Sequence, residues 1–133
     1  MCSSDLRMPL DEHLARHRLA DLFIDTFPCN AHTTASDALW AGLPVLTMMG
    51  ESFASRVAAS LLNALNLPEL IVESLQDYEQ SALKLALNPE YMAQIKTKLQ
   101  MARIESPLFK GDSFAKHLES AFEEMHRQYL RPL

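Results

Sequence analysis

The sequence predicts an α/β fold in which a small parallel sheet is flanked by helices. Segments with strand character alternate with helical patterns, which is typical of parallel sheets with crossover helices. The strand segments are largely apolar without alternation, which predicts burial on both faces. The length of 133 residues fits one domain. The expected strands are residues 22–24, 45–49 and 69–72.

The chain begins with a segment, residues 1–9, that has no periodic pattern. We interpret it as a leader or as the truncated end of an upstream segment. Asp11 is expected to N-cap a short helix over residues 12–20, with Leu14 and Leu19 near one side.

A second helix is expected over residues 33–41. Gly42 followed by Pro44 is a typical helix stop, because glycine adopts the left-handed conformation that ends many helices. The inward-facing candidates are Ala38, Leu39 and Trp40.

A third helix is expected over residues 52–65, which are rich in alanine and leucine. Beyond the third strand only helices are expected. The segment 74–88 opens with Ser74 and has Asp77 three positions later, an aspartate variant of the capping box.

Two more helices complete the expected order. Residues 89–105 form one, and Pro107 interrupts the chain after it. Its apolar face consists of Tyr91, Ile95 and Leu99. The last helix is expected over residues 113–130. Its apolar stripe consists of Phe114, Leu118, Phe122 and Met125.

Composition argues against several classes of protein. The net charge of −5 provides no general attraction for nucleic acid or anionic lipid, and no apolar run has the length of a membrane span. Two distant cysteines, Cys2 and Cys29, favour a reducing compartment over a disulfide scaffold. His13 and His17 have the spacing of helical metal ligands, but no third ligand follows, so we favour a solvated helix face.

The stretch NAHTTASD, residues 30–37, lies where open α/β sheets bind ligands, beyond a strand and at the start of a helix. Free N–H groups and the helix dipole make such an N-terminus an anion site. Thr33 and Thr34 add two hydroxyl donors and His32 adds an imidazole. Asp37, about one turn into the helix, has a carboxylate that can accept from a ribose diol. This order suits a nucleotide.

Helix capping is the alternative interpretation of the same stretch. Thr33 or Thr34 would then cap the helix, and Asp37 would stabilise its dipole. A glycine-rich phosphate loop is excluded, so any phosphate site must use hydroxyls and a helix N-terminus. The only glycines are Gly42, Gly50 and Gly111.

Several ordered motifs resemble the C-terminal catalytic lobe of the O-GlcNAc transferase family, which includes the plant SPINDLY proteins and bacterial homologues with tetratricopeptide repeats. The resemblance runs from about Arg7 to Tyr129. The motifs are DEHLARHRLADLFIDT, NAHTTASDALWAGLPVLTMMGESFASRVAASLL, LPELIV, QDYEQSALKLA and SPLF.

The resemblance implies a GT-B glycosyltransferase, in which two Rossmann-like lobes enclose the sugar nucleotide. Residues 10–133 would be an incomplete C-terminal, donor-binding lobe whose terminal helix, 113–130, packs back across the lobes. The implied reaction is inverting transfer from UDP-GlcNAc to a serine or threonine of a protein, without a metal. The acceptor site belongs to the other lobe, so the isolated chain is expected to be inactive. The resemblance to a family of cytoplasmic enzymes and the absence of a signal sequence lead us to expect a cytoplasmic location.

The resemblance also assigns roles at the phosphate end of the site. His32, Thr33 and Thr34 match the family's diphosphate-contacting HTT motif, and Asp37 matches a ribose-binding carboxylate. The first three would stabilise the leaving group, and no other catalytic residue is assigned.

At the base end, His13 matches a histidine packed by the base and ribose, and Arg16 matches an arginine that reaches the uracil. The backbone of Met8 falls where main-chain groups read the base. Leu10 departs from the animal enzyme, which has a ribose-contacting lysine at that position.

Two alternatives remain open. The first is a SPINDLY-like O-fucosyltransferase that uses GDP-fucose. His32, Asp37 and Trp40 make the chain more similar to the O-GlcNAc transferases, which favours a uridine nucleotide over a guanosine one. The second is a non-catalytic α/β module that serves as an interaction surface.

Overall fold

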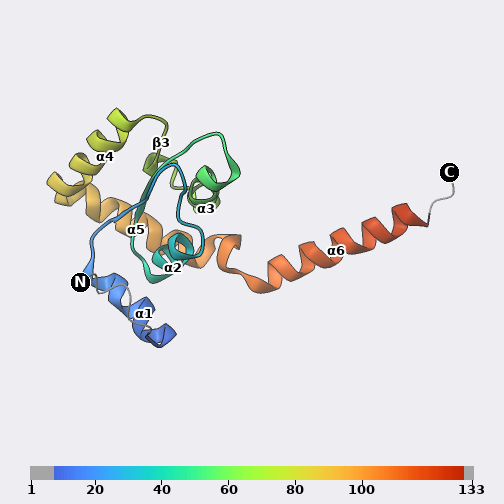
Figure 1. Cartoon of the computed structure of the whole chain (residues 1–133). Coiled ribbons are helices and arrows are strands. Elements are labelled where there is room, and N and C mark those ends of the chain that lie inside the picture. The colour runs from blue at the N-terminus through green and yellow to red at the C-terminus, as the bar shows by residue number, and fades with distance from the viewer. Residues whose placement is uncertain (1–7, 131–133) are drawn as a thin grey trace.

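A three-stranded parallel sheet forms the centre of the computed structural model, which describes residues 8–130 (Figure 1). Its strands are β1 (Phe23–Ile24), β2 (Val45–Met48) and β3 (Ile71–Val72), in the order β1-β2-β3. The parallel sheet predicted from the sequence is therefore confirmed. Of the leader segment 1–9, residues 1–7 lie outside the described part of the chain.

The edge strands are shorter than predicted. β1 pairs only with the first half of β2, with Phe23 opposite Val45, and β3 pairs only with the second half, with Thr47 opposite Ile71. The predicted third strand was too long at its start, because Pro68–Leu70 form a 3-10 turn ahead of β3. The sheet therefore depends on β2, whose four residues are all buried. Successive side chains of a strand point to opposite faces, so both faces are covered, as predicted.

Helix α2 (Thr33–Ala41) has the predicted bounds and connects β1 to β2. It ends at Gly42, whose φ of 90° lies in the left-handed region, as the predicted helix stop requires. Ala38 and Leu39 are fully buried, as predicted. The prediction for Trp40 was wrong: it is 46% exposed and contacts the ring of Phe109 with centroids 5.1 Å apart. Each helical residue advances about 100°, so Trp40 lies beyond the buried face.

Helix α1 (Leu10–Arg16) begins earlier than predicted and continues as a 3-10 turn, His17–Leu19. The N-cap residue is Pro9, not Asp11, and no side chain caps the helix. Asp11 lies inside the first turn, where its negative charge stabilises the helix by interacting with the positive end of the dipole. Leu19 lies at the end of the 3-10 turn and is exposed.

The predicted third helix is divided in two. A 3-10 turn, Phe53–Ser55, precedes α3 (Val57–Ala64), which connects β2 to β3. α2 and α3 are in contact with each other and with β2.

Helices α4 (Leu75–Leu87) and α5 (Pro89–Glu105) follow the sheet as predicted. Ser74 caps α4, because its Oγ accepts from the N–H of Asp77 at 3.1 Å. α4 packs against β2, and α5 packs against α2 and α4. The core contributed by these layers includes Leu39, Val45, Leu62, Leu70, Leu85, Ile95 and Leu99.

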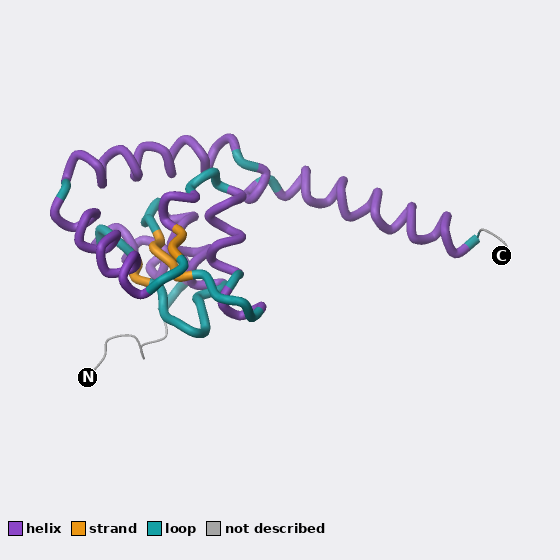
Figure 2. Tube along the Cα trace, turned by 90° about the horizontal axis from the view of Figure 1, so that it is seen from above, coloured by secondary structure: helices purple, strands orange, loops and turns teal. Residues whose placement is uncertain are grey.

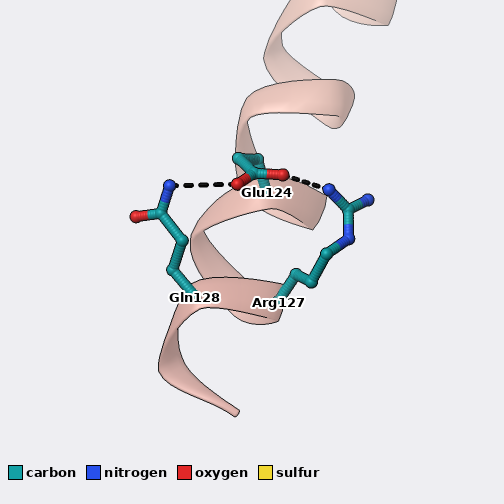
Figure 3. A network of polar contacts seen from close by, with 3 residues as sticks. All are labelled: Glu124, Arg127 and Gln128. Atoms are coloured by element: carbon teal, nitrogen blue, oxygen red, sulfur yellow. Dashed lines mark hydrogen bonds and ion pairs between the residues drawn. The ribbon is translucent and has the colours of Figure 1, made fainter. Parts of the chain in front are cut away.

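Helix α6 (Gly111–Tyr129) extends away from the rest of the fold in both views (Figures 1 and 2). It begins two residues earlier than predicted, after a 3-10 turn at Pro107–Phe109. The predicted apolar stripe is present, but all of its members are exposed. On this helix Glu124 pairs with Arg127 and accepts from Gln128 at 3.0 Å (Figure 3). Such exposed contacts contribute only ~0.2–1 kcal/mol.

In the part of the chain covered by residues 8–130, none of the helices has both the length and the apolar character that a membrane span requires.

Shortening a side chain of the core should destabilise the fold. Leu62 of α3 is fully buried, so Leu62→Ala should lower the free energy of unfolding by about 2–5 kcal/mol in urea denaturation. Leu87→Ala is the control, because Leu87 is 78% exposed, and it should change that free energy by less than about 0.5 kcal/mol. Equal losses in the two variants would contradict this core.

Candidate functional site

The candidate site surrounds the β1–α2 loop, residues 25–32, at the edge where the parallel strands end. This is the edge at which open α/β sheets bind ligands. His32 is the N-cap residue of α2, with φ −106° and ψ −90°, and no side chain caps the helix. The first N–H groups of a helix have no intrahelical partner. The amide end of α2 is therefore open for an anion.

Thr33 and Thr34 are the first two residues of α2, and both are exposed. The capping alternative is wrong for them, because neither occupies the N-cap position. The imidazole of His32 turns toward the segment that follows β2. Its Nε2 lies 3.4 Å from the carbonyl oxygen of Ala54, and its ring meets that of Phe53 edge-on at 5.9 Å. Nδ1 is thus the nitrogen left for a phosphate.

The residues that the resemblance assigns to the base and ribose lie where α1 contacts α2. His13 Nε2 is 3.5 Å from Asp37 Oδ2, and both side chains are partly buried. His17 supports this end, because its Nδ1 lies 3.0 Å from the carbonyl oxygen of His13. The fold thus brings together His13 and Asp37, which are 24 positions apart in the sequence.

The other predicted residues lie at the two ends of α1. Arg16 is exposed in the last turn, on the same helix as His13. Met8 is partly buried just before Pro9, whose carbonyl accepts from the N–H of His13 at 2.9 Å. Leu10, where the animal enzyme has lysine, is 69% exposed.

Asp25 is a site residue that sequence reasoning missed. Its carboxylate is 5% exposed and accepts three hydrogen bonds. Oδ1 accepts from the N–H of Thr26 at 2.8 Å and of Ala31 at 2.7 Å, and Oδ2 accepts from the hydroxyl of Thr47 at 2.7 Å. These bonds explain how a charge is tolerated in the interior. The only signal in the sequence is a carboxylate directly after an apolar strand.

Asn30 is the second buried polar residue of the loop. Its Nδ2 donates to the carbonyl oxygens of Thr26 at 2.8 Å and Met48 at 3.3 Å, and its backbone N–H donates to Ala54 at 2.9 Å. Its Oδ1 has no hydrogen-bond partner among the described residues. Asn30 therefore ties the loop both to itself and to the end of β2.

Tyr78 of α4 adds a further hydrogen bond to the loop that Asp25 and Asn30 hold. Its hydroxyl donates to the backbone carbonyl of Asp25. Burial, and then the negative charge of Asp25, raise the pKa of Tyr78 above its ordinary value.

Neither of two pockets in the structure contains the predicted residues. One, of about 610 Å³, lies beside the end of β2 and is lined by Met49 and Phe53 among others. The other, of about 540 Å³, is lined by His17, Trp40 and Arg103 among others. The predicted residues differ in exposure: Met8, His13 and Asp37 are partly buried, and the exposed ones are Arg16, His32, Thr33 and Thr34. Within residues 8–130, no three His, Cys, Asp or Glu side chains are grouped to hold a metal ion.

The fold defines a class of protein: an α/β lobe with a parallel sheet, in which hydroxyls and a carboxylate lie at and near the N-terminus of α2. The comparisons with known proteins identify the family. Residues 5–118 match the sequence model of glycosyl transferase family 41, so the chain belongs to that family.

Curated relatives of the chain are much longer than the chain itself. A UDP-N-acetylglucosamine–peptide N-acetylglucosaminyltransferase of Caenorhabditis elegans is 41% identical over 90% of this chain and 10% of its own length. A probable enzyme of the same name from Arabidopsis thaliana, SEC, is 43% identical over 86% of this chain and 12% of its own length. A SPINDLY protein of Hordeum vulgare is 34% identical. The chain thus spans about a tenth of these relatives.

A solved structure has the same fold. The O-GlcNAc transferase of Thermobaculum terrenum, as its K341M mutant, superposes with a TM-score of 0.83 and 32% identity. The match covers 91% of this chain and 23% of that one. The predicted fold class, part of a GT-B glycosyltransferase with a Rossmann-like parallel sheet, is therefore confirmed, as is the family resemblance.

The raised pKa of Tyr78 predicts a loss of stability at alkaline pH. The unfolded chain releases this proton near pH 10 and the folded chain only at higher pH. The stabilisation is therefore complete below about pH 10 and is lost as pH rises through the folded pKa. Tyr78→Phe should lower the free energy of unfolding at pH 7 by about 0.5–1.5 kcal/mol, through the lost hydrogen bond, and flatten its decline above pH 10.

Urea denaturation between pH 7 and pH 11 measures both effects. The control is Tyr129→Phe, because Tyr129 is exposed on α6. Parallel pH curves for the wild type and Tyr78→Phe would contradict the prediction.

Proposed function

We propose that this chain is the donor-binding part of a protein O-linked N-acetylglucosaminyltransferase, which binds UDP-GlcNAc for inverting transfer to serine or threonine of a protein. Membership of glycosyl transferase family 41 and the names of its relatives support the proposal. The observation that carries it is the uncapped amide end of α2, with Thr33 and Thr34 on it and Asp37 one turn along.

The diphosphate would lie at the amide end of α2. The free N–H groups there, together with the hydroxyls of Thr33 and Thr34, can donate to phosphate oxygens, and the helix dipole favours negative charge. The Nδ1 of His32 would be a further donor. These groups are held in place before the reaction, so they can stabilise charge that develops on the leaving UDP.

The uridine would extend from there toward α1. Asp37 would accept from the ribose hydroxyls, beside the ring of His13 at 3.5 Å. Arg16 and the backbone of Met8 would recognise the uracil, as the resemblance implies.

The chain covers about a tenth of its curated relatives and 23% of the bacterial transferase chain. We therefore assign the acceptor-binding groove to another part of a longer protein, and expect the isolated chain to bind the donor without transferring sugar. The exposed apolar stripe of α6 fits a helix that packs against that other part. We expect the parent enzyme to act in the cytoplasm and to need no metal.

Asp37 should be required for nucleotide binding. Asp37→Ala removes a charged hydrogen-bond acceptor, so it should weaken UDP binding by about 1–3 kcal/mol in calorimetric titration. Asp112→Ala is the matched control, because Asp112 lies in the first turn of the projecting helix α6.

The same titrations separate the alternatives. Tighter binding of GDP than UDP would favour a SPINDLY-like donor. If neither nucleotide binds, even in a longer protein that completes the sheet, the chain is an interaction module and the proposal fails.

Leu10 offers a gain-of-affinity test. Leu10→Lys restores the residue that the animal enzyme has at this position, at the exposed start of α1 and one turn before His13. It should strengthen UDP binding by about 0.2–1 kcal/mol, as expected for a solvent-exposed charge pair. Leu19→Lys adds the same charge at another exposed position and should have a smaller effect. Equal effects would indicate general charge attraction and not a ribose contact.

A further inference from the structure

The β1–α2 loop is held by a buried carboxylate that does not itself reach the surface. Asp25 is 5% exposed, and both of its oxygens are occupied by donors from the protein. Three of its roughly four acceptor sites are in use, and its burial keeps the carboxylate away from a nucleotide at the surface. Its contacts join the end of β1 to β2 through Thr47 and to the loop through Ala31.

The contact with Ala31 determines the geometry of the phosphate end. Ala31 directly precedes His32, the N-cap residue of α2, whose carbonyl accepts from Ser36 N–H at 3.1 Å. A 2.7 Å bond from the Ala31 amide to Asp25 fixes the peptide plane at the entrance of the helix. Asn30, 4% exposed, holds the neighbouring peptide through the carbonyl oxygens of Thr26 and Met48.

We propose that Asp25 is a positioning residue for diphosphate binding: it holds the β1–α2 loop so that the first amides and hydroxyls of α2 face the phosphates. The inference rests on the proposed function, and it concerns a residue that touches no ligand. Its action is through the Ala31 amide, and it serves the phosphate end only, because His13 and Asp37 lie on α1 and within α2.

The charge of Asp25 is not what the ligand needs, because a carboxylate near an anion site repels the anion. Its acceptor oxygen is what matters. In Asp25→Asn the remaining Oδ1 can still accept from both amides, and the new NH₂ group can donate to the Thr47 hydroxyl. The asparagine variant should therefore keep the loop geometry, whereas Asp25→Ala leaves the amides without an acceptor.

The test compares UDP with uridine, which lacks the phosphates, by NMR titration of the 133-residue chain. Asp25→Ala should weaken UDP binding by about tenfold and leave uridine binding within about twofold. Asp25→Asn should retain UDP binding within about threefold. The control is Ser106→Ala, which removes a buried polar group far along the chain from the loop. The Ser106 hydroxyl donates to the Ala64 carbonyl at 2.8 Å, and its loss should not change the ratio of the UDP and uridine affinities.

Equal losses for UDP and uridine in Asp25→Ala would indicate a merely structural role and overturn the inference. Unchanged affinity for both would overturn it as well. If Asp25→Ala does not fold, Thr47→Val replaces it, because it removes the donor to Oδ2 alone. That variant should weaken UDP binding by about threefold with uridine binding unchanged, and an equal effect on both ligands would again overturn the inference.

A second readout separates this inference from the proposed function. If neither UDP nor GDP binds the wild-type chain or a longer protein that completes the sheet, the proposed function fails at that step. The hydrogen exchange of the Ala31 amide still tests the positioning role, because Asp25→Ala or Thr47→Val should accelerate it and Asp25→Asn should not. An Ala31 amide that exchanges equally slowly in every variant would overturn it.

Discussion

The burial of β2 on both faces is the constraint on which the rest of the structure depends. β1 and β3 have two residues each and pair with opposite halves of β2, and within residues 8–130 neither pairs with another strand. Thr47 is the polar member of this buried strand, and its hydroxyl needs an acceptor. Asp25 supplies it, and the charge of Asp25 in turn requires donors, which the loop amides provide. One buried hydroxyl is thus connected to the start of α2.

The same loop bears on the two interpretations of NAHTTASD, of which capping by Thr33 or Thr34 is wrong and ligand binding stays a prediction. A side-chain cap would have used one of the first amides of the helix, whereas α2 begins at Thr33 and its N-cap residue, His32, makes no such bond. The start of α2 is held by the hydrogen bonds of Ala31 and Asn30 in the preceding loop, and not by a capping hydroxyl. The first N–H groups of the helix therefore remain available to a ligand. Asp37, which could have served only the dipole, instead faces His13 of another helix.

Local patterns predicted the parts of the fold that have local causes. The bounds of α2 were correct because Gly42 and Pro44 end a helix whatever surrounds it, and the Ser74 cap formed because its partner is three residues away. The prediction that Trp40 faces inward was wrong because helical periodicity does not show how wide the buried face of a helix is. Asp25 was missed because its partners include Thr47, 22 residues away, and the approach of His13 to Asp37 required a packed α1–α2 contact. Non-local pairings of this kind follow from topology, which the family resemblance implied and composition did not.

The proposed function gives one reason for the exposed groups of this chain. A donor site between two lobes would have one wall from each, and this chain matches 23% of the bacterial transferase. Helix α6 carries an apolar stripe with no covering layer in the described chain, although exposed apolar surface of this kind normally marks an interface. Thr33, Thr34 and the stripe of α6 are exposed, as the proposed function expects if each is half of a contact. The hydrogen bonds of Asp25 behind the loop are made within the described residues, so the start of α2 keeps its geometry without a ligand.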